Sequence, residues 1–284
     1  MTVEWTPERL LNENYLDASS PFRIYEHSIT NKIETHWHEF FEIAFVLSGS
    51  GVHTLNGVSR RLERGLLFLL TPADFHEIAP DPGETIRLYD LIFLESFIKY
   101  DLLELIYANS PYSYPFEPKE ADQLEELCRR IWDETRNADI GHSILIQGAL
   151  ERLLIDLARA CRKSTPAARE GSSAPHLLHP SLRRGLVYMH HHFREPLTLA
   201  KVANYAGLSA TYFSECFSKQ VGLSYQNYLQ QLRLKFAKSL LASTELTITE
   251  VCFAAGFNTV PHFERVFKQT YHQTPSGYAK QKLN

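Results

Sequence analysis

A duplicated segment in the last third of this 284-residue chain restricts its possible folds more than any other feature. Five residues of the first segment recur 49 positions later: Leu197, Thr198, Val202, Ala206 and Gly207 correspond to Leu246, Thr247, Val251, Ala255 and Gly256. One extra residue in the second turn gives the offset of 50 that relates Phe213, Phe217 and Tyr228 to Phe263, Phe267 and Tyr278. The repetition predicts two copies of one supersecondary unit.

Each copy has the sequence pattern of a helix-turn-helix. A threonine stands where the first helix needs an N-cap, and Gly207 or Gly256 can end that helix through the left-handed region. Ser209 can cap the second helix of the first copy, and Asn258 or Thr259 that of the second. Apolar residues at i, i+3 and i+4 then give the second helix one buried face. The pattern predicts units at about 197–219 and 246–269, joined by a helix over 228–243 that fixes the distance between them. On that helix the apolar spacing places Arg233, Lys235 and Lys238 outward.

The outward face of each second helix is the candidate for reading DNA, because such a helix lies in the major groove and presents its exposed residues to base edges. In the first copy these residues are Ala210, Thr211, Ser214, Glu215 and Ser218. In the second copy they are Asn258, Val260, Pro261, Glu264, Arg265 and Lys268. Units about 34 Å apart could enter successive grooves on one side of the duplex. A helical scaffold that binds another protein is the alternative.

The charge distribution favours a nucleic-acid partner for this part of the chain. Residues 181–284 contain 12 basic and 5 acidic side chains, a net charge of +7, whereas the other 180 residues have 17 basic and 28 acidic side chains, a net of −11. A basic module joined to an acidic one is typical of a DNA-binding domain attached to a domain that does not bind DNA. The hydrophobic content of 44% and charged content of 22% exclude a disordered or coiled-coil chain.

The first half of the chain has strand patterns followed by helix patterns. Short apolar or alternating runs over about 22–94 are separated by turns, of which Asn56-Gly57 is the strongest hairpin signal. Helical periodicity follows over about 96–163, and its last segment has an apolar stripe from Ile146 to Cys161. That stripe is equally suited to packing on the strands or to forming a dimer interface. Residues 164–175 have linker composition, so we expect domains at 1–163 and 176–284.

A group of histidines and one glutamate marks a candidate site within the strands. His36 and His38 project to the same face of a strand, Glu42 keeps that parity, and His76 could join them from a facing strand. These donors suit zinc, nickel, manganese or iron. Hydrogen bonds to a small organic ligand without a metal are the interpretation we favour. Trp37 and Tyr89 are aromatic candidates to line such a ligand site.

These motifs together resemble the AraC/XylS family of transcription regulators. The C-terminal match comprises Ala206-Gly207-Leu208-Ser209, Ala255-Gly256-Phe257 and the terminal Thr274-Pro275-Ser276-Gly277-Tyr278. The histidine and glutamate pattern resembles the cupin-like sensor domain of the same family. One departure is His272, which stands where the second copy is expected to have the glycine seen at Gly222 in the first. Another is that the glycine usual between Pro72 and His76 is missing.

The resemblance implies an α+β chain of two domains, a cupin-like antiparallel β barrel with following helices and an all-α domain with two helix-turn-helix units. It implies a regulator that binds double-stranded promoter DNA and responds to a small molecule, which we expect to be a sugar or a related metabolite. It also implies a homodimer, contact with RNA polymerase if the protein is an activator, and no required cofactor. The alternative is a cupin metalloenzyme with an accessory helical domain, in which His36, His38, Glu42 and His76 would hold a divalent metal.

No membrane or export segment is evident in the sequence. No run reaches the roughly 18 apolar residues of a membrane helix, and the first residues lack the order of a signal peptide. We therefore expect a cytoplasmic, nucleoid-associated protein. The triplet His190-His191-His192 lies in a helical pattern that sends consecutive side chains in different directions, so we expect ordinary helix surface there rather than a metal site.

Overall fold

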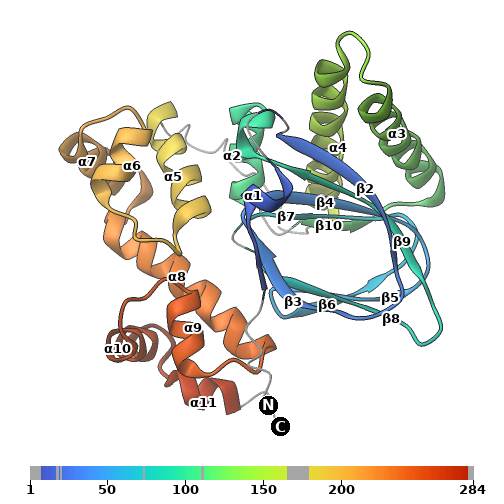
Figure 1. The fold of residues 1–284 in the computed structure, drawn as a ribbon. Helices are drawn as coiled ribbons and strands as arrows, with labels where there is room; N and C mark the ends of the chain where they lie inside the picture. The colour runs from blue at the N-terminus through green and yellow to red at the C-terminus, as the bar shows by residue number, and fades with distance from the viewer. Residues whose placement is uncertain are drawn as a thin grey trace. The chain divides into compact units, whose positions relative to one another are not determined.

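The computed structural model describes residues 8–16, 19, 21–72, 74–109, 112–164 and 179–280. The described residues up to 164 belong to one compact unit, and those from 179 onward belong to a second unit (Figure 1). The predicted linker at 164–175 lies outside the described residues except for Ser164, which ends a helix.

The first unit is built on two five-stranded sheets, which are called the barrel below. Its strands are β1 (Glu8–Leu10), β2 (Phe22–Ile29), β3 (Ile33–His38), β4 (Phe41–Ser48), β5 (Gly51–Leu55), β6 (Val58–Leu62), β7 (Leu66–Leu70), β8 (His76–Pro80), β9 (Ile86–Phe93) and β10 (Tyr112–Pro115). One sheet has the order β1-β3-β8-β5-β6 and the other β10-β7-β4-β9-β2, with antiparallel pairing except between β1 and β3. The expected antiparallel barrel is confirmed.

Alternation along the strands decides which side chains enter the barrel. Ala44 and Val46 of β4 belong to a buried cluster that includes Phe68 of β7 and Ile78 of β8, so both sheets contribute to one core. Residues of the opposite parity on β4 face outward. The predicted hairpin at Asn56-Gly57 is confirmed, because both residues have positive φ and Leu55 pairs with Val58 across the turn.

Helices follow the barrel, as expected for residues 96–163. They are η1 (Glu95–Phe97), α2 (Tyr100–Asn109), α3 (Pro118–Asn137) and α4 (His142–Ser164), in addition to the short α1 (Asn12–Tyr15) near the start of the chain. The apolar stripe of α4 is buried within the chain at Ile146, Leu150, Leu153, Leu154 and Leu157, where α4 packs against α2, α3 and β10. Of the two alternatives for this stripe, the structure therefore favours packing on the same domain.

The second unit contains the two predicted helix-turn-helix motifs. Its helices are α5 (Pro180–His192), α6 (Leu199–Tyr205), α7 (Ala210–Val221), α8 (Tyr225–Ser243), α9 (Ile248–Ala254), α10 (Val260–Tyr271) and α11 (Pro275–Lys280). Helices α6 and α7 form the first motif, α9 and α10 form the second, and α8 connects them. The expected all-α domain is confirmed.

Local capping chemistry explains the boundaries of these helices. Thr198 caps α6, and Thr247 forms a capping box with Glu250 at the start of α9. Ser209 caps α7 as predicted, whereas Thr259 occupies the N-cap of α10 without a side-chain hydrogen bond. His272 ends α10 in the left-handed region at φ 59°, so the second copy keeps the geometry that Gly222 gives the first.

Two expectations about side-chain exposure in this unit are wrong. His190 is half-buried on α5, and its Nε2 lies 2.8 Å from the Tyr228 hydroxyl of α8. This side of α5 therefore faces α8 and not solvent alone. Arg233 of α8, expected to point outward, donates to the carbonyl oxygens of Phe193 at 2.7 Å and Glu195 at 2.9 Å. Arg233 therefore ties α8 to the segment that follows α5.

None of the described helices is both long enough and apolar enough to span a lipid bilayer.

Candidate functional site

The predicted DNA-reading residues lie on the open faces of α7 and α10, except Asn258, which lies in the turn before α10. The apolar residues Phe213 and Phe217 of α7, and Phe263 and Phe267 of α10, are fully buried and hold each helix in its motif. The opposite faces are accessible: Ala210, Ser214 and Val260 are half-buried, and Thr211, Glu215, Ser218, Asn258, Pro261, Glu264, Arg265 and Lys268 are exposed. The structure thus brings the predicted residues together on one face of each helix.

Arg265 is held in place on this face by two neighbours on α10. Its Nη2 lies 3.1 Å from His262 Nδ1, and its Nη1 donates to Gln269 Oε1 at 3.4 Å. The guanidinium group needs an acceptor, so this contact requires the His262 tautomer with an unprotonated Nδ1. The neighbours hold a fork of donors that is suited to paired contacts with the O6 and N7 atoms of guanine.

Sequence reasoning missed two exposed aromatic side chains at equivalent positions. Tyr212 is 50% exposed in the first turn of α7, and His262 is exposed in the first turn of α10. Each directly precedes the buried phenylalanine of its helix, so its side chain points away from the core. The sequence contained a signal for this pair, because Tyr212 and His262 are 50 residues apart, the same spacing that relates the other residues of the two second helices.

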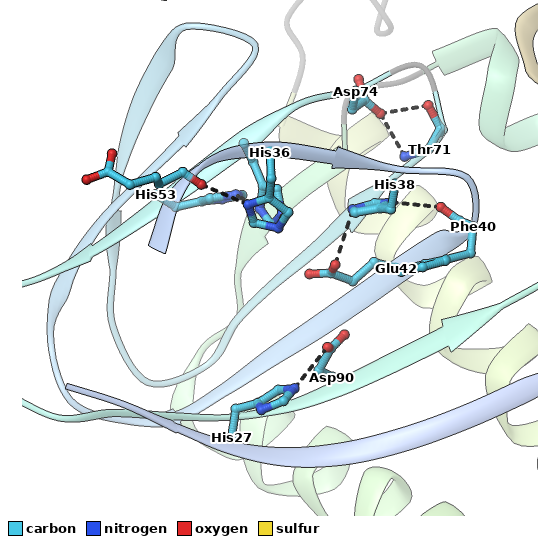
Figure 2. A network of polar contacts seen from close by, with 11 residues as sticks. His27, His36, His38, Phe40, Glu42, His53, Thr71, Asp74 and Asp90 are labelled. Carbon is cyan, nitrogen blue, oxygen red and sulfur yellow. Dashed lines mark hydrogen bonds and ion pairs between the residues drawn. The ribbon is translucent and has the colours of Figure 1, made fainter. Parts of the chain in front are cut away.

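A cavity of about 580 Å³ opens inside the barrel. Strands from both sheets line it: β2 and β9 contribute His27 and Asp90, β4 contributes Glu42, and β3 and β8 contribute His36 and His76. Figure 2 shows the side chains of His27, His36, Glu42 and Asp90 pointing into the barrel from different strands. The cavity therefore brings imidazole groups from one sheet opposite carboxylates from the other.

The imidazole wall belongs to a hydrogen-bonded row of three histidines, of which His36 and His76 line the cavity and His53 lies behind them. His76 Nε2 lies 2.9 Å from His36 Nε2, and His76 Nδ1 lies 3.1 Å from His53 Nε2. Burial lowers the pKa of His53 to about 4, and burial together with the neighbouring rings lowers the pKa of His76. Neutral rings at these two positions can donate and accept along the row.

The carboxylate wall contains two acid groups, each paired with a histidine. Glu42 Oε2 lies 3.2 Å from His38 Nε2, and Asp90 Oδ2 lies 3.3 Å from His27 Nε2. Burial opposes charge on His38, but its hydrogen bond to Glu42 raises the pKa of His38 above the ordinary value. Burial, followed by the charge of Glu42, raises the pKa of Asp90 to about 6, although His27 opposes this shift.

The six predicted ligand residues do not all lie in the cavity. His36, Glu42 and His76 line the cavity, and His38 lies fully buried behind Glu42. Trp37 and Tyr89 are not among the lining residues. Trp37 lies on the opposite face of β3 from its histidine neighbours, and the Tyr89 ring lies 6.3 Å from the Trp132 ring of α3, outside the barrel. Both corrections follow from strand parity.

The sequence patterns missed two lining residues, His27 and Asp90, and the buried His53 that is hydrogen-bonded to His76. His27, His53 and Asp90 come from strands outside the two histidine motifs, and a single polar residue in a strand has no diagnostic spacing. Strand alternation relative to Ala44 and Val46 would have identified Asp90 as inward-facing once the register of β4 and β9 was known.

The donor atoms also permit a test of the metal hypothesis. His38, Glu42 and His76 each offer one ligand atom within 4.8 Å of the others, and two imidazoles with one carboxylate suit a divalent transition metal. His36, the fourth predicted ligand, is hydrogen-bonded to His76 instead. A bound metal would displace the contact between His38 and Glu42 and at least one hydrogen bond of His76. The residues fit a metal by type.

Comparison with protein-family models gives two matches. The AraC-like ligand binding domain matches residues 20–154, which contain the cavity. The helix-turn-helix domain matches residues 202–281, which contain both α7 and α10. The two matches do not overlap, and each falls within one of the two compact units.

Relatives of the chain include the HTH-type transcriptional activator RhaS of Escherichia fergusonii, which is 23% identical over 244 residues, 84% of this chain and 85% of the relative. An uncharacterized HTH-type transcriptional regulator of Staphylococcus aureus is 36% identical over 91 residues, 32% of this chain and 12% of the relative. Among solved structures, ToxT of Vibrio cholerae covers 91% of this chain and 97% of its own, with 15% identity and a TM-score of 0.39. The C-terminal domain of AraT of Geobacillus stearothermophilus covers 37% and 88%, with 33% identity and a TM-score of 0.36.

Proposed function

Because the chain belongs to the AraC/XylS family of transcription regulators, with a cupin-like ligand-binding domain and a helix-turn-helix DNA-binding domain, we propose that its barrel cavity controls how α7 and α10 engage a promoter. An effector that binds one arrangement of the two units better than another shifts their populations by its difference in affinity. Such a shift changes DNA binding without any new contact between effector and DNA.

The observation that supports DNA reading by both helices is their equivalent exposure. Each of α7 and α10 buries a phenylalanine pair on one side and leaves polar residues open on the other. These faces lie in a part of the chain with a net charge of +7, although the whole chain has a net charge of −4. The local charge favours contact with phosphates.

The test is selection of duplexes from a random DNA library by the full-length chain, followed by affinity measurement at increasing salt. We expect an enriched motif in two parts, and a fall in affinity of about 10³ to 10⁵ between 50 and 200 mM salt if six to ten phosphates are contacted. Failure to enrich any motif at low salt would contradict the proposal.

The finer points of the proposal concern the effector and the partners. We propose a sugar or a related metabolite as effector, a homodimer as the active species, contact with RNA polymerase if the protein activates, and action in the cytoplasm at the nucleoid. The proposed domain limits are 1–163 and 176–284. Analytical ultracentrifugation of the full-length chain tests the dimer, since the mass of one chain is 32.7 kDa.

A divalent metal in the cavity is a second proposal that the donor set supports. If a metal binds, His38, Glu42 and His76 would hold it, and it would supply a positive centre for oxygen atoms of an effector. Metal analysis of protein purified without chelator, and thermal unfolding with and without EDTA, test this point. Unchanged unfolding and absence of metal would exclude it.

We propose that the protein is a regulator without catalytic activity. A cupin metalloenzyme remains the competing function because of the same histidine and glutamate group. One variant distinguishes the two functions. In a regulator, His38→Ala should alter how DNA binding responds to the effector. In an enzyme, it should abolish turnover and leave DNA binding unaffected.

A further inference from the structure

The carboxylate wall of the cavity contains an oxygen atom with no hydrogen-bond donor. Asp90 Oδ2 faces His27, but Asp90 Oδ1 is buried and has no hydrogen-bond partner among the residues that the structure describes. An ionised carboxylate only accepts hydrogen bonds, and a buried acceptor without a donor is costly. A ligand that donates at this position would remove that cost.

A second carboxylate lies close to the first on the adjacent strand. Asp90 of β9 pairs with Ala44 of β4, and Glu42 is two residues from Ala44 on the same face. Side chains in this diagonal relation are within reach of each other. Burial is the main cause of the raised pKa of Asp90, and the charge of Glu42 adds to it, so a cation between the two carboxylates would favour their ionised forms.

The basic groups near these carboxylates already have acid partners. The Lys32 ammonium group lies 2.7 Å from Glu34 and 3.3 Å from Glu77, so it faces acids of its own. His38 Nε2 faces Glu42 and His27 Nε2 faces Asp90 Oδ2, so neither histidine pairs with Asp90 Oδ1.

Aromatic rings are placed beside the acid pair. Tyr25 of β2 is directly opposite Asp90 in the β2–β9 pairing, and Tyr15 and Phe40 line the same cavity with ring centroids 5.4 Å apart. Ring faces attract a cation that has lost part of its water. Carboxylates together with aromatic rings form a pocket suited to an ammonium group rather than to an anion.

We propose that the effector carries a protonated primary or secondary amine, which donates to Asp90 Oδ1 and lies beside the Glu42 carboxylate. The inference rests on the proposed role of the cavity as the effector site. A hydroxyl group could also donate to Asp90, but it would bring no positive charge to the two carboxylates or to the ring faces. A quaternary ammonium group has the charge but no hydrogen to donate.

The experiment compares amines with alcohols of the same skeleton by calorimetric titration of the full-length chain in EDTA. The pairs are glucosamine with glucose, and 2-phenylethylamine with 2-phenylethanol. We expect at least one amine to bind about tenfold or more tightly than its alcohol, because hydrogen bonds to charged groups contribute more than neutral ones. Asp90→Asn should remove that preference. The control, Asp122→Asn, makes the same change at an exposed site of α3 and should leave it intact.

If Asp90→Asn fails to fold by circular dichroism, Glu42→Gln replaces it and should reduce the preference for the amine. The inference is wrong if no amine binds more tightly than its alcohol, or if the preference persists in the folded cavity variants. DNA affinity measured on the same preparations separates the two proposals. Loss of DNA binding by every preparation contradicts the regulator function, whereas normal DNA binding without amine preference contradicts only the ligand class.

Discussion

The glycine that ends the first helix of each motif has the same backbone conformation but different surroundings. Gly207 has φ 71° and Gly256 has φ 83°. A Cβ atom at Gly207 would meet no atom within 4 Å, whereas at Gly256 it would lie 2.6 Å from the Arg194 carbonyl oxygen. The sequence repeat predicted both left-handed turns, but only the structure shows that the second is packed against backbone.

This difference predicts unequal effects of the same substitution. Gly207→Ala should destabilise the protein by about 1–2 kcal/mol, the cost of a left-handed alanine. Gly256→Ala should destabilise it by roughly 3 kcal/mol or more, because overpacking is added to that cost. Urea unfolding of both variants measures the difference. Equal losses would contradict the packing described at Arg194.

His190 gives a pH-dependent prediction. Burial lowers the pKa of His190 to about 4 in the folded chain, against an ordinary value of 6.5. Between those values the unfolded chain binds a proton that the folded chain does not, so stability falls as the pH drops from 6.5 to 4. The loss from this residue is on the order of 3 kcal/mol.

The substitution His190→Gln removes the titration and keeps a polar group near Tyr228. We expect a flatter dependence of unfolding free energy on pH over this window, measured by urea titration at several pH values. The control is His142→Gln, which changes a histidine in α4 of the other unit. A slope as steep as that of the unchanged chain would exclude the buried, neutral state of His190.

Among secondary-structure elements, helix α10 is the better candidate for base recognition. His262 and Gln269 hold the Arg265 guanidinium on the exposed face. Arg265→Ala should weaken binding to the selected sequence by about 1–3 kcal/mol and relax the preference at one base pair. Fluorescence anisotropy with matched and mutated duplexes measures both effects. Arg129→Ala, an exposed arginine of α3, is the control. A uniform loss across all sequences would identify Arg265 as a phosphate contact instead.

Helix α4 shows why an apolar stripe does not by itself identify an interface. Leu153 is fully buried within one chain, whereas Ile144 on the same helix is 76% exposed. Leu153→Ala should destabilise the folded chain by about 2–5 kcal/mol, and Ile144→Ala should have little effect on unfolding. Unfolding and sedimentation of both variants separate stability from association. Dissociation of an otherwise stable Leu153→Ala dimer would restore the interface alternative.

For the molecule as a whole, the features that could be predicted from the sequence are those that depend on a few neighbouring residues. Helix caps at Thr198 and Ser209, the hairpin at Asn56 and the order of the two domains follow from short-range chemistry. The cavity was only half predicted, because His36 and His76 belong to motifs, whereas Asp90 enters through the register between strands. The tie made by Arg233 was missed because periodicity alone placed that residue outward.

Because contacts within the second unit fix the distance between the two helix-turn-helix motifs, we expect the spacing between the two parts of the DNA site to be fixed as well. Arg233 joins α8 to the segment after α5, and the turn at Gly256 packs against Arg194 of the same segment. Inserting about five base pairs between the two parts of the selected motif turns one part to the opposite side of the duplex, since a helical turn is about 10.5 base pairs. Affinity should fall to that of a single part. Retained affinity in a gel-shift titration would show that the two motifs move independently.

The tie at Arg233 also bears on how promoters under this protein's control can change. A single base substitution weakens one contact, and the gene stays regulated at a lower level. A small insertion or deletion inside the site removes the gene from control in one event. Spacing is therefore the property to hold constant when a genome is searched for the targets of this regulator.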